Sequence, residues 1–188
     1  MTAVRFERAA VRDWAFPRAA AGVRLLVDHA REHGMAEPEV LAGSGLTADG
    51  LATATEVTAA QELRVVRNLR RRLGEVGDQV GRRYRATTFG VLGYALVSSH
   101  TLLDAMNVAL RFLDLSHTFA IPSAAVDGER VRIVVSGADL PGDVRGFLVD
   151  RDAAAIRAVL REIGPEGVTT TSAREGDAVV VSLPEITA

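Results

Sequence analysis

The sequence predicts an α+β fold: a helical N-terminal half, then a β-hairpin, a long helix and a second β-hairpin that together form a small, mostly antiparallel sheet. Three observations predict this class. Apolar residues recur at helical spacing over most of the chain up to Leu113. The pattern changes to alternation after Leu115, around the tight-turn pair Asp127-Gly128. A long helical pattern and two further β-prone runs follow.

The bulk composition fits one domain with its own core. The chain has 188 residues, 48% of them hydrophobic, and no cysteine, which excludes disulfide frameworks, cysteine-based zinc sites and thiol catalysis. A net charge of −2 does not favour nucleic-acid binding by this chain alone. Neither a signal peptide nor a membrane span is expected, because no apolar run is long enough. We expect a cytoplasmic chain with a lead-in over 1–17 and a single domain over 18–188.

Four helices are predicted in the first half. The first is amphipathic, and the second has a proline in its first turn. The third opens with a capping box formed by Thr58 and Gln61. Three arginines at its end, Arg70–Arg72, complement the helix dipole. The predicted ranges are 19–34, 37–42, 58–73 and 78–87, with the segment 43–57 as a connection.

The longest apolar stretch, Phe89–Leu113, predicts a helix, a sharp turn and a second helix. Gly90 and Gly93 let another backbone come close. They do not form a phosphate loop, because the Lys and Ser/Thr of a P-loop are missing. Thr101 and Asp104 have the spacing of a capping box that opens the second helix.

The C-terminal third predicts hairpin, helix and hairpin. The first hairpin spans 117–136, with Pro122 marking an edge or a bulge. The second has strands at 168–172 and 178–183. The long helix between them ends at Gly164 and carries an apolar seam at near-heptad spacing. This seam either forms a dimer interface or covers the sheet, and covering the sheet is the favoured alternative. The residues in question are Val149, Ile156, Leu160 and Ile163.

Catalytic and metal sites find little support in the residues. His29 and His33 have a spacing that suits a metal, but no third ligand is evident. Both fall off the apolar face of their helix, which indicates a solvated surface. His100 follows two serines without the nucleophile elbow that a hydrolase needs, so a role in the turn is favoured. We therefore expect no metal, no cofactor and no catalytic residue.

The block Phe89–Ala105, FGVLGYALVSSHTLLDA, with the pair Arg111-Phe112 after it, resembles a known family. It is similar to the N-terminal effector-binding domain, often labelled arabinose-binding-like, of one branch of the AraC/XylS-type bacterial transcription regulators. The resemblance extends from Val23 to about Ile163. The phenylalanine-rich segment that follows the long helix in that family is shortened here.

The resemblance implies a sensor domain that binds a small-molecule effector and often supports dimerisation. DNA would be contacted only through a helix-turn-helix domain that this chain does not contain. A largely apolar effector and a homodimer are expected. Alternatives are a small cofactor-free enzyme using His117 or His100, or a structural dimerisation module; a dry, filled interior would favour the latter. The aromatic and histidine residues near the helix–hairpin junction are the expected ligand contacts, with plain core packing as the favoured alternative for each: Trp14, Phe89, Tyr94, Phe112, His117 and Phe119.

Overall fold

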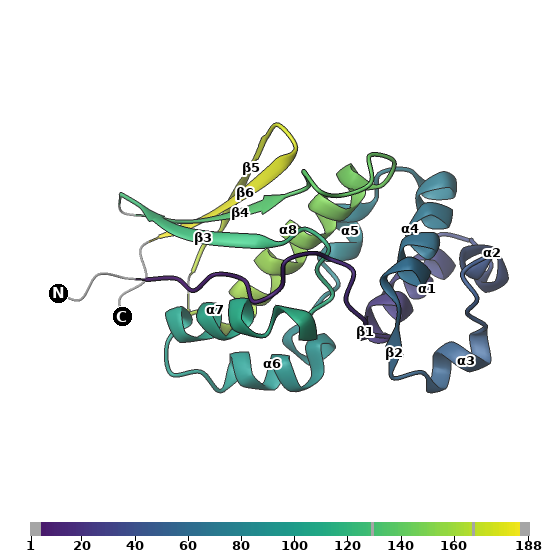
Figure 1. Ribbon diagram of the computed structural model, residues 1–188, viewed down its shortest axis with the longest axis horizontal. Coiled ribbons are helices and arrows are strands. Elements are labelled where there is room, and N and C mark those ends of the chain that lie inside the picture. Colours follow the sequence, from purple (N-terminus) through teal and green to yellow (C-terminus); the bar gives the residue numbers. More distant parts are fainter. Residues whose placement is uncertain (1–4, 129, 167, 185–188) are drawn as a thin grey trace.

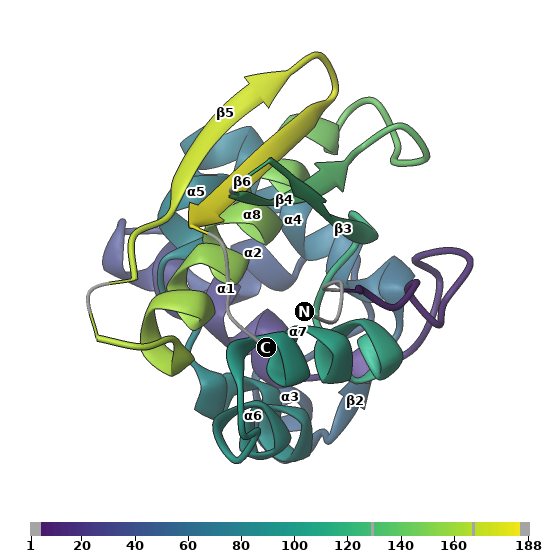
Figure 2. The ribbon, with the colours of Figure 1, turned by 90° about the vertical axis from the view of Figure 1, so that its left-hand side faces the viewer.

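The computed structural model describes residues 5–128, 130–166 and 168–184 and confirms the α+β class. A four-stranded antiparallel sheet of order β3-β4-β6-β5 packs on the long helix α8 (Arg145–Ile163). Figure 1 shows helices α1 to α4 gathered at one end of the molecule and the α6–α7 hairpin across from the sheet. Figure 2, turned by 90°, shows the sheet above α7 and α6 below it. No helix within the described ranges is both long and apolar enough to cross a membrane.

The N-terminal helices follow the predicted ranges closely. The predicted capping box is present: the Thr58 backbone N–H donates to Gln61 Oε1 (2.9 Å), and the Gln61 N–H donates to Thr58 Oγ1 (3.2 Å). The segment 43–57 is more than a connection, because it contains α3, which Thr47 caps through the backbone N–H of Gly50. It also contains β2 (Glu56–Val57), which pairs with β1 (Arg18–Ala19). The helices are α1 (Ala21–Glu32), α2 (Glu37–Leu41), α3 (Ala48–Thr53) and α4 (Ala59–Leu73).

The helix predicted over 78–87 is wrong in its extent. The structure has the short helix α5 (Gly77–Gly81) and then the 3-10 turn η1 (Ala86–Phe89). The glycines at the two ends of α5 explain why it can lie so close to α8. A Cβ on Gly77 would lie 2.2 Å from the carbonyl oxygen of Phe147, and a Cβ on Gly81 would lie 2.2 Å from that of Arg151. These glycines therefore let α5 lie directly on the backbone of α8.

The predicted helical hairpin is confirmed as α6 (Gly90–Val97) and α7 (Leu102–Arg111), followed by the 3-10 turn η2 (Leu113–Leu115). Gly93 makes the expected close approach, because a Cβ there would lie 1.7 Å from the carbonyl oxygen of Ala86. Gly90 has a different role. Its φ of +54° turns the chain from η1 into α6. Thr101 caps α7 by accepting from the N–H of Asp104 (3.0 Å), but the Asp104 carboxylate accepts from the Thr101 hydroxyl (2.8 Å) instead of completing a capping box.

The strands of the main sheet start later than predicted. Residues 117–121 are not a strand, since the backbone N–H groups of Phe119 and Ala120 both donate to the carboxylate of Asp152 on α8 (2.8 Å each). The segment is thus held on the helix and enters the sheet only at Pro122. The first strand of the second hairpin is likewise displaced from its predicted range. The strands are β3 (Pro122–Asp127), β4 (Arg130–Ser136), β5 (Thr171–Glu175) and β6 (Ala178–Pro184).

Residues 5–17 of the predicted lead-in dock on the domain as an N-terminal arm; residues 1–4 lie outside the described part. The Glu7 N–H donates to Asn107 Oδ1 on α7 (2.8 Å), and the Ala10 N–H donates to the Leu110 carbonyl (3.1 Å). An ion pair joins Glu7 to Arg111. The arm runs along α7 towards β1 (Figure 1), so these polar contacts attach it to one helix of the hairpin.

Candidate functional site

An apolar cavity of about 110 Å³ lies between the α6–α7 hairpin, α8 and the sheet. Among the described residues that line it, Thr118 alone has a polar side chain, and none is charged. The wall is formed by Phe89, Leu92, Leu96, Ala105, Met106, Ala109, Leu110, Thr118, Pro122, Ala124, Ile133, Ala155, Ile156, Val159, Leu160 and Ile163.

The cavity is built by helices with apolar inner faces and by small residues. The predicted apolar face of α7 supplies Met106 and Leu110. On the sheet, Ala124 of β3 and its cross-strand neighbour Ile133 of β4 face the same space. Four alanines from α7, β3 and α8 line the cavity, and a methyl group fills far less volume than a leucine side chain. The space exists because these positions carry small side chains: Ala105, Ala109, Ala124 and Ala155.

The lining limits what the cavity can hold. A buried hydroxyl or charge that finds no hydrogen-bond partner costs several kcal/mol. Here one threonine hydroxyl is the only polar side-chain group available. The cavity therefore suits a small apolar molecule better than a charged one.

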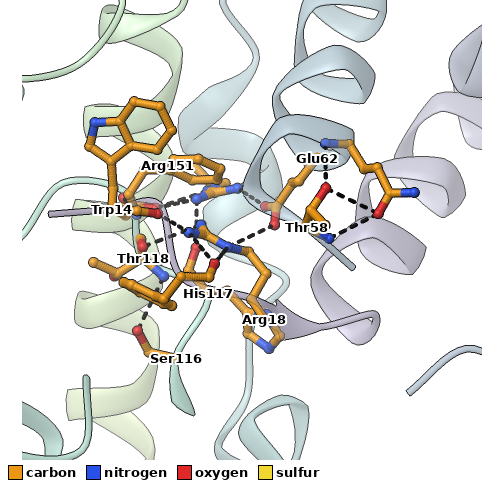
Figure 3. Close-up of polar contacts among 12 residues, drawn as sticks. Trp14, Arg18, Thr58, Glu62, Ser116, His117, Thr118 and Arg151 are labelled. Atoms are coloured by element: carbon orange, nitrogen blue, oxygen red, sulfur yellow. Dashed lines mark hydrogen bonds and ion pairs between the residues drawn. The ribbon is translucent and has the colours of Figure 1, made fainter. Parts of the chain in front are cut away.

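A second feature is a buried ion network (Figure 3), which adjoins the cavity at Thr118. Arg151 of α8 is at its centre. Its guanidinium donates to Glu62 Oε1 of α4 (2.6 Å), to Asp152 Oδ1 (2.9 Å) and to the His117 carbonyl (2.8 Å). Arg18 of β1 adds a looser pair, with its Nε 3.8 Å from Glu62 Oε2. All four charged side chains are at most 2% exposed, so two cations and two anions balance one another inside the protein.

The two buried arginines respond to the network in opposite ways. Burial acts to lower the pKa of Arg151, but the carboxylates of Asp152 and Glu62 outweigh it and raise that pKa above its usual value. For Arg18, burial is the larger influence and lowers the pKa, with Glu62 offsetting it only in part. Arg18 also donates to the carbonyl oxygens of Trp14 and Phe16. The network therefore joins the N-terminal arm to α4 and α8.

Contacts connect the cavity to the network. Phe89 lines the cavity, and its ring centroid lies 5.1 Å from that of His117 and 5.8 Å from that of Tyr84. Thr118 also lines the cavity, and its carbonyl accepts a hydrogen bond from Arg18 (3.4 Å). Phe89 and Thr118 thus connect the cavity wall to the residues that contact Arg151 and Arg18.

The residues predicted to contact a ligand fall into three groups. Phe89 lines the cavity. His117 and Phe119 are buried behind it and belong to the network, together with Trp14, whose ring lies 5.7 Å from Phe119. The remaining two, Tyr94 and Phe112, lie on the surface with 77% and 45% of their area exposed.

The seam of α8 has its partners within this chain. Val149 and Leu160 are buried, and Leu160, Ile156 and Ile163 line the cavity. This placement agrees with the alternative in which the seam covers the sheet.

Sequence reasoning missed the charged residues of the network and misplaced one histidine. Glu62 precedes Val66 and Leu69 by four and seven residues, so it lies on the buried face of α4, where an acid signals a buried charge. His29 was expected on a solvated surface but is 3% exposed, because it follows Leu26 on the buried side of α1. Within the described ranges, no group of three or more side chains from His, Cys, Asp and Glu is arranged to hold a metal ion.

The position of His117 predicts that acid destabilises the fold. Burial lowers its pKa below the usual 6.5, and burial lowers that of His29 too. Below about pH 6.5 the unfolded chain therefore binds more protons than the folded one, and the free energy of unfolding decreases as the pH falls, by at most about 1.4 kcal/mol per pH unit for each histidine. Urea unfolding at pH 7.5, 6.5 and 5.5 measures this. His117→Gln should flatten the dependence, whereas substitution of the exposed His100 should not; an unchanged slope in His117→Gln would contradict the assignment.

Comparisons with known proteins agree on one family. The family model described as the N-terminal arabinose-binding domain of AraC transcription regulators matches residues 34–174. Two uncharacterized HTH-type transcriptional regulators, Rv1395 of Mycobacterium tuberculosis and Mb1430 of Mycobacterium bovis, are each 32% identical over 139 residues. The match covers 72% of this chain but 40% of each relative. No solved structure matches.

Proposed function

This chain belongs to the family of N-terminal arabinose-binding domains of AraC transcription regulators, and from that premise we propose that it senses a small-molecule effector. The family is one of regulatory domains. The chain spans 40% of the length of the relatives it matches, which are named as HTH-type transcriptional regulators. Its own part in such a regulator would be to bind the effector and to bias an attached or associated DNA-binding domain in the bacterial cytoplasm. We also propose that the domain forms a homodimer.

The apolar cavity is the observation that carries this proposal. It is enclosed by helices and strands from three parts of the fold, as effector pockets commonly are. Its lining favours an uncharged, largely apolar effector. A pentose, the sugar in the family's description, would bring several hydroxyl groups to a wall with one threonine hydroxyl, and each unpaired hydroxyl would weaken binding.

The cavity volume limits the size of the effector. An engineered cavity of about 150 Å³ holds benzene. The volume of about 110 Å³ here is smaller, so an effector of that size or larger would have to displace part of the wall. Such a displacement is what a sensor requires, because a ligand shifts a conformational equilibrium only if it binds one arrangement better than the other.

The enzyme alternative has less support. His117 is 2% exposed, and its Nε2 lies 3.1 Å from the carbonyl of Thr88, so it has no access to a substrate in solution. His100 is exposed, but no described cavity includes it. A purely structural dimerisation module would be expected to have a filled interior. The interior instead contains a cavity, which favours the sensor.

A thermal-shift experiment tests the proposal. Benzene, toluene and L-arabinose are the probes. A ligand at about ten times its Kd adds about 1.4 kcal/mol, which raises the Tm of a domain of this size by about 3–6 °C. We expect such a rise with benzene or toluene and none with L-arabinose. A rise with arabinose alone would contradict the apolar assignment.

Two neighbouring alanines provide a matched pair of variants. Ala124 lines the cavity, whereas Ala125, the next residue of β3, is exposed on the other side of the strand. Ala124→Leu should fill part of the cavity and abolish the shift with toluene, and Ala125→Leu should leave the shift unchanged. Equal shifts in both variants would mean that the probe binds elsewhere.

A further inference from the structure

Helix α6 exposes an apolar face on its outer side. Val91, Tyr94 and Val97 are 80%, 77% and 62% exposed, although each would be expected in a core. They succeed one another at intervals of three residues, so they lie on one side of the helix. Between Arg85 and Asp104 the chain carries no aspartate, glutamate, lysine or arginine. An uncharged helix with a continuous exposed apolar face marks an interaction surface.

The inner face of α6 is already occupied. Leu92 and Leu96 are buried and line the cavity, while Gly93 lies against the backbone of η1. The exposed face therefore has no partner within the described chain and cannot be turned inward without emptying the core. Figure 1 shows α6 at the outer edge of the molecule, where a second protein has access to it.

We propose that α6 packs antiparallel against α6 of a second copy of this chain, about a two-fold axis near Tyr94. This inference rests on the proposed homodimer and gives it a surface. Val91 and Val97 stand three residues before and three residues after Tyr94. A two-fold axis at Tyr94 thus places Val91 of one copy opposite Val97 of the other, so the patch is complementary to itself. The antiparallel arrangement also places the positive end of each helix dipole beside the negative end of its partner.

The charges at the two ends of α6 fit the same arrangement. The exposed Arg85 precedes its N-terminal end, next to Arg82, whose charge is already paired with Asp78 (2.5 Å). The exposed Asp104 lies in the first turn of α7, which follows its C-terminal end. In an antiparallel pair, the basic end of one helix faces the acidic end of the other. The rim of the interface is therefore of opposite charge across the axis, which favours a second copy of this chain over an unrelated apolar partner.

Pairing and effector binding share one helix. Leu92 and Leu96 contact the cavity, and Val91, Tyr94 and Val97 form the pairing surface. If an effector displaces α6, it changes the strength of pairing, and by linkage pairing changes the affinity for the effector by the same factor.

Disulfide trapping tests the arrangement directly, because the natural chain has no cysteine. Near a two-fold axis, the two copies of a Tyr94→Cys residue come close enough for a disulfide, which requires Cα atoms about 4.4–6.8 Å apart. We expect mild oxidation to convert Tyr94→Cys into a covalent dimer. The control is Val126→Cys, an exposed apolar position on β3, which should form no covalent dimer. Crosslinking of Tyr94→Cys no faster than that of Val126→Cys would overturn the proposal.

Sedimentation velocity and native mass spectrometry test the α6 pairing surface separately from the homodimer and from the effector. Tyr94→Glu should weaken the dimer about tenfold or more, since aromatic residues at the centre of interfaces contribute most. Val126→Glu should leave it unchanged, and both variants should keep the wild-type circular dichroism spectrum. If Tyr94→Glu stays dimeric, the homodimer is retained and the α6 surface is wrong. If the wild type is monomeric at all concentrations, both fail, whereas the effector proposal is judged separately by the thermal shift.

Discussion

Arg151→Met is expected to lower the free energy of unfolding by about 3–5 kcal/mol. The guanidinium of Arg151 holds two carboxylates and one backbone carbonyl in a part of the core that excludes water. Its removal leaves Glu62 and Asp152 buried with Arg18 as the remaining cation, at 3.8 Å from Glu62. Urea unfolding at pH 7.5 measures the change.

Two further variants make this result specific to the network. Arg161→Met removes an exposed arginine from the last turn of the same helix and should change the stability by no more than about 0.5 kcal/mol. Adding Glu62→Gln to Arg151→Met should recover part of the loss, because the uncompensated carboxylate disappears. A loss below about 1 kcal/mol in Arg151→Met would show that the ion network contributes little to stability.

Gly93→Ala is expected to cost about 3 kcal/mol, at the upper end of the range for overpacked cores. The new methyl group would lie 1.7 Å from the carbonyl oxygen of Ala86. The backbone fixes the position of both atoms, so neither can avoid the clash by a side-chain rotation. The α6 helix would have to move outward, which enlarges the cavity that Leu92 and Leu96 line. Thermal and urea unfolding measure the loss.

Gly146→Ala is the matched control, since Gly146 also lies in a helix. A Cβ there would have its nearest neighbour at 3.7 Å, in the side chain of Glu75. That substitution should stabilise the protein by up to about 1 kcal/mol, because alanine has the higher helix propensity. If Gly93→Ala were equally stabilising, α6 would not be held against η1 as the structure indicates.

The elements predicted correctly are those with long periodic patterns. Helix α4 shows its cap and its apolar face in the sequence, and α8 repeats its seam over about four turns. Elements formed by tertiary contacts were missed. Strands β1 and β2 have two residues each and show no alternation. Residues 117–121 alternate as a strand would, but hydrogen bonds to Asp152, distant in sequence, hold them on α8.

The cavity could be predicted only in part. Sequence reasoning looked for aromatic side chains, and among these Phe89 alone lines the cavity. The space itself arises where alanines from α7, α8 and β3 face one another, and their proximity depends on the packing of three elements. The network was accessible in principle, because Glu62 stands at a buried position of a clear amphipathic helix. Its partners come from distant segments, which a single sequence does not relate to one another.

The docking of the N-terminal arm gives the native chain an intrinsic fluorescent probe. Trp14 is the only tryptophan, and its indole N–H donates to the Asp139 carbonyl (3.1 Å) while its ring packs near Phe119. All tryptophan emission therefore originates where the arm meets the buried charges. The contact of Trp14, Phe119, directly follows Thr118 of the cavity wall. The wavelength and polarisation of that emission report the attachment of the arm in unlabelled protein, alone or mixed with candidate effectors.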